Sequence, residues 1–283
     1  MKSYQSSRPI RLAAFFFIFL SSVFHHSFIY AADDASAWFL DDIHAQKGWE
    51  FLGETHADPA SGVIVAVIDT GCDYSHPLIQ NALWTNTAEQ NGITGEDDDG
   101  NGYTDDVYGV NICGADGNPM DDSVGTIQGH GTHVAGCVLQ TAGVTETENP
   151  FGIRIMPIKA GDAYGNFQAA DVAKALYYAV ENGASVINLS ISSPKFPAVL
   201  QEAVEYASRS AIIVASAGNQ GLASADSQYS SCKDFYPAAC PYVVGVMSHQ
   251  KNRTLSPFSN WAFSSALCPK YDVTAPGESI LSC

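Results

Sequence analysis

The segment "VIVAVI" (Val63–Ile68) is a continuous run of apolar, mostly β-branched residues between Gly62 and Gly71. Such a run is typical of a strand that is buried on both faces, as in a parallel sheet. Similar runs follow along the chain at "IRIMPI" (Ile153–Ile158), "SVINLS" (Ser185–Ser190), "AIIVAS" (Ala211–Ser216) and "YVVGVM" (Tyr242–Met247). We therefore expect several buried parallel strands, and an aspartate, Asp69, directly follows the first run.

Segments between these runs have the apolar spacing of helices. One such face comprises Phe196, Val199, Leu200, Ala203, Val204 and Ala207, and a preceding one comprises Val172, Leu176, Ala179 and Val180. Strands that alternate with helices predict crossover connections. We expect an α/β, three-layer fold with a mainly parallel central sheet and helices on both faces. In such sheets, functional groups gather at the carboxyl ends of the strands.

The composition indicates one large acidic domain. The chain has 283 residues, of which 46% are hydrophobic, and this is enough to bury a large core. Its formal net charge is -17, from 30 acidic and 13 basic residues. A surface of this sign repels phosphate backbones, so we expect no nucleic-acid partner.

The amino-terminal residues resemble an export signal. Lys2, Arg8 and Arg11 form a basic start, "LAAFFFIFLSSVF" forms an apolar core, and Ala31–Ala32 offer small residues for cleavage. A membrane anchor is the alternative, but the apolar run is short and ends at two histidines. We expect residues 1–32 to be a signal peptide and residues 33–283 to be the secreted domain, with no stable membrane anchor.

Export makes the seven cysteines candidates for disulfide bonds. Cys232 and Cys240 are close enough in sequence to close a small loop, although sequence alone does not determine the pairing. Because the number of cysteines is odd, one is left without a partner. We expect the mate of Cys283 to lie beyond the last residue.

Three motifs carry the functional argument. Asp69 begins "DTG", which also occurs in aspartic proteases, but the chain has no second such motif and that activity would need a homodimer. "GHGTHVAG" (Gly129–Gly136) places His130 between two glycines at the start of an apolar helix. Its two histidines could bind zinc, yet no glutamate lies between them as a metalloprotease base. "SAGNQG" (Ser216–Gly221) places Asn219 just after a buried strand.

In this order, the three motifs resemble those of the subtilases, the subtilisin-like serine proteases. The resemblance extends from about Trp38 to the last residue. It implies that His130 is the general base, that Asp69 orients and stabilises its imidazole, and that Asn219 donates a hydrogen bond to the oxyanion.

The resemblance also suggests where a substrate lies. Ser190, Ile191 and Ser192 match the family segment that pairs with a substrate peptide. "GDAYGNF" (Gly161–Phe167) matches the opposite wall of the cleft, where Gly165 leaves room for the backbone and Phe167 supplies an apolar floor. Family members often have two glycines where this chain has Ser192 and Ser193, so the resemblance does not determine the width of the pocket.

An acidic insert, "EDDDGNGYTDD" (Glu96–Asp106), lies between the Asp69 and His130 motifs. The candidate calcium ligands, Asp97, Asp99, Asn101 and Asp105, stand at the first, third, fifth and ninth positions of an EF-hand-like loop. Gly102 stands at the sixth position, where that loop turns sharply. Tyr108 stands where the bidentate glutamate of that loop is expected. We expect a structural Ca²⁺ site, and a solvated acidic loop is the alternative.

The sequence therefore predicts a secreted serine endopeptidase that acts on proteins or peptides as a monomer. In subtilases the nucleophile lies in a Gly-Thr-Ser-x-Ala motif, which this chain does not contain; Ser282 matches a serine that precedes it. We expect the chain to be the amino-terminal part of the catalytic domain, with its carboxyl-terminal part missing. The alternative is an inactive subtilase-like domain that binds a partner or calcium.

Overall fold

The structure is a computed structural model that describes residues 38–54, 62–223, 233–262 and 270–283. Seven strands form one sheet: β1 (Ile64–Asp69), β2 (Val110–Asn111), β3 (Arg154–Lys159), β4 (Val186–Leu189), β5 (Ile212–Ser216), β6 (Val243–His249) and β7 (Val273–Pro276). Every neighbouring pair is parallel, in the order β2-β3-β1-β4-β5-β6-β7. The expectation of an α/β fold built on a parallel sheet is confirmed.

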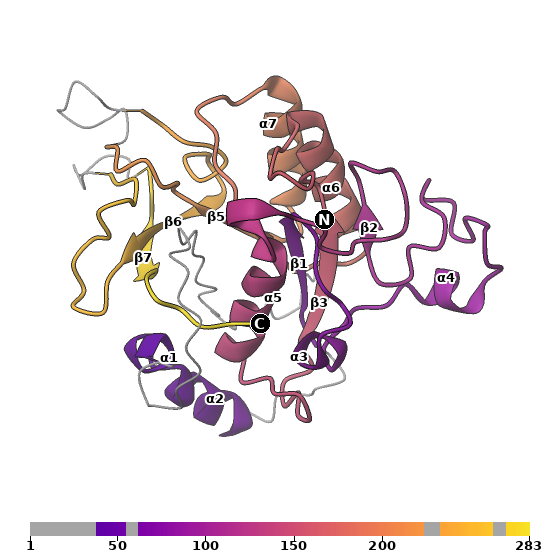
Figure 1. The fold of residues 1–283 in the computed structure, drawn as a ribbon, viewed down its shortest axis with the longest axis horizontal. Helices are drawn as coiled ribbons and strands as arrows, with labels where there is room; N and C mark the ends of the chain where they lie inside the picture. Colours follow the sequence, from indigo (N-terminus) through magenta and orange to yellow (C-terminus); the bar gives the residue numbers. More distant parts are fainter. Residues whose placement is uncertain (1–37, 55–61, 224–232, 263–269) are drawn as a thin grey trace, which may run out of the picture.

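The helices are α1 (Trp38–Asp42), α2 (Ala45–Glu54), α3 (Pro77–Gln80), α4 (Thr87–Asn91), α5 (His130–Thr141), α6 (Ala169–Glu181) and α7 (Ala198–Ala207). A short 3₁₀ helix, η2 (Gly125–Ile127), precedes α5. Helices α6 and α7 cover one face of the sheet, and α3 and α5 cover the other (Figure 1).

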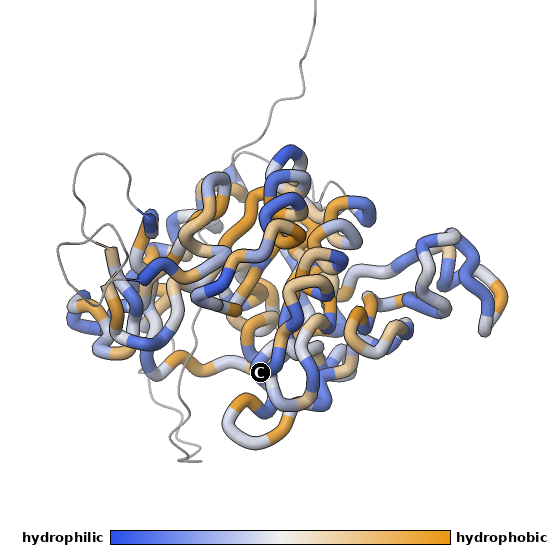
Figure 2. Tube along the Cα trace, turned by 90° about the horizontal axis from the view of Figure 1, so that it is seen from above, coloured by the Kyte–Doolittle hydropathy of each residue, from blue (hydrophilic) through white to orange (hydrophobic). Residues whose placement is uncertain are grey.

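Alternation along each strand separates the two cores. In β1, Ala66 and Ile68 face the core under α6 and α7, whereas Val65 and Val67 face the core under α5. All four side chains are buried, and this is why the strand reads as an uninterrupted apolar run. Hydrophobic residues accordingly lie along the inner elements in Figure 2, and hydrophilic residues dominate the segment that projects around α4.

One expected core residue is exposed. The apolar spacing predicts Val199 on the buried face of α7, but Val199 is 44% exposed. The helix begins at Ala198, so Val199 lies in its first turn, while Leu200 and Ala203 are buried. The core-facing stripe of α7 is therefore narrower than the sequence pattern predicts.

The connection order places a cleft beside β1. From β1 the chain crosses to β2 and β3 on one side of it, and then returns to β4 on the other side. Asp69, the last residue of β1, is in register with Lys159, the last residue of β3. In open parallel sheets, ligands bind outside the carboxyl ends of the strands where the order reverses in this way.

The amino-terminal helices pack against the face that carries α5. The indole Nε1 of Trp49 donates a hydrogen bond of 2.9 Å to the carbonyl of Thr141, the last residue of α5. Asp42 pairs with Arg253 at 2.8 Å and with His249 at 3.4 Å.

In the part of the chain that the structure describes, no helix is both long and apolar enough to cross a bilayer.

Candidate active site

Asp69 and His130 contact each other at the edge of the sheet formed by the carboxyl ends of the strands, beside the central strand β1. Asp69 is fully buried at the end of β1, and His130 is the first residue of α5. Nδ1 of His130 lies 2.7 Å from Oδ1 of Asp69, which also accepts a 2.7 Å hydrogen bond from the backbone of Thr70. The aspartate thus holds one ring nitrogen, and Nε2 is left for a reacting group.

The electrostatics of the pair favour proton uptake by the imidazole. Burial alone lowers the pKa of His130, but the charge and hydrogen bond of Asp69, with the charge of Asp121, outweigh burial and raise it. Oδ2 of Asp69 is buried and has no hydrogen-bond partner among the described residues. Few hydrogen-bond donors therefore compete with His130 for the negative charge of this carboxylate, which stabilises positive charge on the imidazole.

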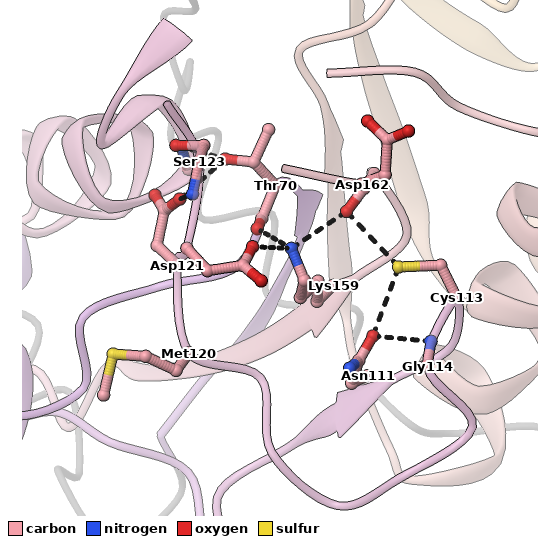
Figure 3. A network of polar contacts seen from close by, with 12 residues as sticks. Thr70, Asn111, Cys113, Gly114, Met120, Asp121, Ser123, Lys159 and Asp162 are labelled. Carbon is pink, nitrogen blue, oxygen red and sulfur yellow. Dashed lines mark hydrogen bonds and ion pairs between the residues drawn. The ribbon is translucent and has the colours of Figure 1, made fainter. Parts of the chain in front are cut away.

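Asp121 ties the start of α5 to the end of β1, and Figure 3 shows it near Thr70. Its Oδ1 accepts from the hydroxyl of Thr70 at 3.2 Å, and its Oδ2 accepts from the backbone and hydroxyl of Thr132 at 3.2 and 3.0 Å. The hydroxyl of Thr70 in turn accepts from the backbone of Gly131 at 3.1 Å. An acidic side chain is favourable at a helix N-terminus, where backbone N–H groups lack partners.

Lys159 joins the loops on either side of the site. Its ammonium is buried and donates to the carbonyl oxygens of Thr70 at 2.8 Å and Gly161 at 3.0 Å, and it pairs with Asp122 at 2.6 Å. Figure 3 shows this amine pointing into the space between the two loops. A buried lysine needs such partners to remain charged, and here they fix the segment after Asp69 to the wall that begins at Gly161.

A cleft of ≈ 630 Å³ opens beside His130. All the residues expected to contact a substrate line it, together with the histidine: Gly165, Phe167, Ser190, Ile191 and Ser192. Residues for which the sequence predicts no contact with a substrate also line it, and they include Ile127, Lys195, Leu200 and Tyr236. Ile127 ends the short 3₁₀ helix η2 and Tyr236 lies in a loop. Neither segment has periodic patterning, so no sequence signal placed these residues here.

Asn219 lies in the loop after β5 and is half-buried. A fully buried residue, Asn260, fixes this loop: its Oδ1 accepts from the backbone of Gln220 at 3.0 Å, and its Nδ2 donates to the carbonyl of Ala217 at 2.9 Å. Among the described residues, the lining of the cleft does not include Asn219. Its predicted contact with an oxyanion therefore stays a prediction.

The acidic insert brings together a set of carboxylates that differs from the predicted one. Carboxylate oxygens of Glu89, Asp97 and Asp99 lie within 4.8 Å of one another. Asn101 is adjacent, because its Nδ2 donates to Oδ2 of Asp99 at 3.1 Å. Asp105 instead accepts from the backbone of Gly95 at 3.0 Å. Hard oxygen ligands at this spacing fit a calcium ion.

Glu89 was missed because it lies in α4, outside the loop that matched the EF-hand spacing. Its buried side chain accepts backbone hydrogen bonds from Asp98 at 2.7 Å and Asp105 at 2.9 Å. Glutamate is almost never buried without a partner, so the burial of Glu89 marks it as a residue of interest. That burial is visible only in the folded chain.

The carboxyl-terminal residues pack along α5. Ser282 donates its hydroxyl to the carbonyl of His133 at 2.9 Å, and Nε2 of His133 lies 3.2 Å from the carbonyl of Ile280. Cys240 and Cys283 carry free thiols, as do the other cysteines of the described residues: Cys72, Cys113 and Cys137. Cys232, the expected partner of Cys240, and the expected signal peptide, residues 1–32, lie outside the described residues.

Comparisons with known proteins agree with this geometry. The sequence model of the subtilase family matches residues 60–283. The chain belongs to the subtilase family. It is 32% identical over 263 residues to the thermophilic serine proteinase of Bacillus sp. (strain AK1), a match that covers 87% of this chain and 53% of that protein. It is 33% identical over 222 residues to the major intracellular serine protease of Bacillus subtilis (strain 168), covering 77% and 59%.

Solved subtilase-like structures share the fold. The crystal structure of a cold adapted subtilisin-like serine proteinase matches with a TM-score of 0.56 at 25% identity and covers 78% of this chain and 65% of that one. The crystal structure of a lanthipeptide protease matches with a TM-score of 0.58 at 25% identity, covering 86% and 62%. This subtilase chain thus spans between half and two thirds of the length of these relatives.

Proposed function

We propose that this subtilase is a serine endopeptidase in which His130 is the general base and Asp69 orients it. The imidazole takes the proton of a serine hydroxyl through Nε2 and later gives it to the leaving amine. Asn219 donates to the oxyanion of the tetrahedral intermediate. The serine is supplied by sequence outside the 283 residues, since no Gly-Thr-Ser motif occurs within them.

One observation carries this proposal, namely the 2.7 Å contact between the buried Asp69 and a histidine that lines the cleft. A carboxylate and an imidazole in this arrangement activate a hydroxyl nucleophile. The test is hydrolysis of a fluorogenic peptide by the full-length protein. His130→Ala should abolish turnover, whereas His44→Asn, at an exposed histidine with a φ of 57° that asparagine tolerates, should leave it unchanged.

The cleft walls support binding of an extended peptide. Ser190–Ser192 follow β4 and present backbone groups on one side, and Gly165 and Phe167 form the other side. A peptide that pairs with such edges gains affinity from main-chain hydrogen bonds. We therefore propose protein or peptide substrates, bound by a monomeric enzyme.

We also propose that Glu89, Asp97, Asp99 and Asn101 hold a structural Ca²⁺ ion. The charges of the three carboxylates, Glu89, Asp97 and Asp99, repel one another at this spacing, and a divalent cation removes that repulsion. The ion would be a structural one, because its ligands lie in the insert and α4, apart from the residues that line the cleft.

The protein is proposed to be exported. The basic start at Lys2, the apolar segment that follows it and the small residues at Ala31–Ala32 support a signal peptide over residues 1–32. Edman or mass-spectrometric identification of the mature amino terminus in the culture medium tests this; a mature chain that begins at Met1 would contradict it.

A further inference from the structure

The loop between β4 and α7 is tied to the segment at Tyr236, which also lines the cleft. The backbone N–H of Ser193 donates to the carbonyl of Tyr236 at 2.9 Å, and the N–H of Tyr236 returns a hydrogen bond of 2.8 Å. The ring of Phe196 stacks on the ring of Tyr236 with centroids 4.7 Å apart. Between these two anchors, the backbone N–H of Lys195 donates to the hydroxyl of Ser193 at 3.1 Å.

The residues on both sides of Lys195 limit its freedom further. Pro194 precedes it, Pro197 lies two positions after it, and each proline fixes its own φ. Pro197 and Lys195 both line the cleft. The backbone therefore places the start of the lysine side chain at a defined point on the edge of the cleft.

Lys195 is an unneutralised cation there. Its side chain is exposed, and within the described ranges it has no ion pair. By contrast, Lys159 pairs with Asp122, and Lys174 pairs with Asp171. No carboxylate from the described residues lines the cleft, so nothing on its walls cancels this charge.

The cation on the cleft wall is opposite in sign to the net charge of the protein. The chain has a formal net charge of -17, yet among the described residues the side chains that line the cleft include Lys195 and no carboxylate. His130 adds no net positive charge, because the buried carboxylate of Asp69 faces it at 2.7 Å. A cation on a wall that also contains apolar groups such as Phe167 and Leu200 attracts a carboxylate more strongly than one in open water. The same charge disfavours a lysine or arginine side chain at that place.

We propose that Lys195 is a specificity-determining residue that selects peptides with an aspartate or glutamate side chain at the position that faces it. The inference rests on the proposed peptidase function and adds a substrate class to it. An exposed ion pair of this kind gives roughly a two- to fivefold preference, and that preference weakens as salt is added.

The experiment compares peptides that differ only by Glu against Gln, scanned one position at a time through a neutral sequence. Binding is measured by fluorescence anisotropy on the full-length protein with His130→Ala, which keeps the peptides intact, and kcat/KM is measured on the wild-type protein. Both measurements are repeated in Lys195→Met, Lys195→Arg and Lys195→Glu. Lys174→Met, an exposed lysine outside the cleft, is the matched control.

We expect one position at which Glu binds more tightly than Gln. The preference should disappear in Lys195→Met, persist in Lys195→Arg, invert in Lys195→Glu and remain in Lys174→Met. Equal binding of the paired peptides at every position overturns the inference, as does a preference that survives Lys195→Met. If the preference is present but no peptide is cleaved, the proposed activity is wrong and the assignment of Lys195 stands.

Discussion

Nδ1 of His130 lies 2.7 Å from Oδ1 of Asp69, although the residues are separated by 61 positions in the sequence. The contact exists because β1 ends beneath the amino terminus of α5, and because Asp121 ties both ends together through Thr70 and Thr132. The end of β1, the start of α5 and the loop that carries Asp121 are distant in sequence, and together they determine the position of the His130 ring.

The first prediction concerns pH. A general base must be neutral to act, so kcat/KM should rise with pH as His130 loses its proton, with a midpoint above the ordinary histidine value of about 6.5. The charge of Asp121 helps to raise the pKa of His130, so Asp121→Asn should move the midpoint to lower pH. A full pH–rate profile of both proteins measures this. A midpoint in Asp121→Asn at or above that of the wild type would contradict it.

The second prediction concerns Asn219. Asn219→Ala should lower kcat by roughly 10²–10³ with little change in KM, a magnitude that is known for the oxyanion asparagine of subtilisin, a member of this family, and is carried over from it. Steady-state kinetics with a peptide substrate check it. Gln201→Ala, at an exposed position of α7 that does not line the cleft, is the control, and a kcat for Asn219→Ala within about twofold of wild type would remove the asparagine from the mechanism.

The third prediction concerns calcium. Because an ion that binds only the folded state stabilises it, saturating Ca²⁺ should raise the Tm. Glu89→Gln and the double change Asp97→Ala with Asp99→Ala should each reduce this rise, whereas Asp105→Asn should retain it, since Asp105 contacts the backbone of Gly95. Thermal unfolding with Ca²⁺ and with a chelator provides the comparison.

An identical Tm in both conditions for the wild-type protein would end the calcium proposal. Loss of the Ca²⁺-induced rise in Asp105→Asn with no loss in Glu89→Gln would restore the EF-hand-like ligand set that the sequence predicts. The rise in Tm, and not the Tm itself, is the relevant readout, because the buried side chain of Glu89 also supports the loop.

The fourth prediction concerns Gly165 on the cleft wall. Its φ is +75°, and an added Cβ would lie 2.7 Å from Cδ1 of Ile127. Gly165→Ala should therefore cost about 1–2 kcal/mol in the free energy of unfolding from the left-handed backbone alone, and should raise KM by displacing Ile127 into the cleft. Denaturant unfolding and peptide kinetics measure the two effects.

Adding Ile127→Ala to Gly165→Ala separates the two effects. The second change should restore KM, because it removes the side chain that the new Cβ displaces, but it should not restore stability, because the backbone strain remains. Recovery of stability with no recovery of KM would show that Ile127 does not shape the cleft.

Local patterns were sufficient to predict the central strands. Continuous apolar runs predicted β1, β3, β4, β5 and β6 to within two residues at each end, because strands buried on both faces have no polar positions to interrupt the pattern. Strand β2, Val110–Asn111, is too short to produce a pattern of its own. It forms only because the chain passes beside the end of β3.

The site was predictable where a motif fixes residues near a strand end or a helix start. Asp69 and His130 belong to this class, and the structure brings them together. Lys195 reaches the cleft through a loop and Ile127 through the short helix η2, and the course of these segments depends on distant contacts, such as the pairing of Ser193 with Tyr236. Sequence spacing contains no information about such contacts, so these residues became visible only in the folded chain.

Covalent labelling by a serine-directed phosphonylating probe, followed by mass spectrometry of the labelled peptide, tests most directly whether His130 activates a serine nucleophile. The full-length protein and the 283-residue chain are treated side by side, each with and without His130→Ala. We expect a label on a serine in a Gly-Thr-Ser sequence of the full-length protein, loss of that label in His130→Ala, and no label on the 283-residue chain. Labelling of Ser282, or labelling that is independent of His130, would contradict it.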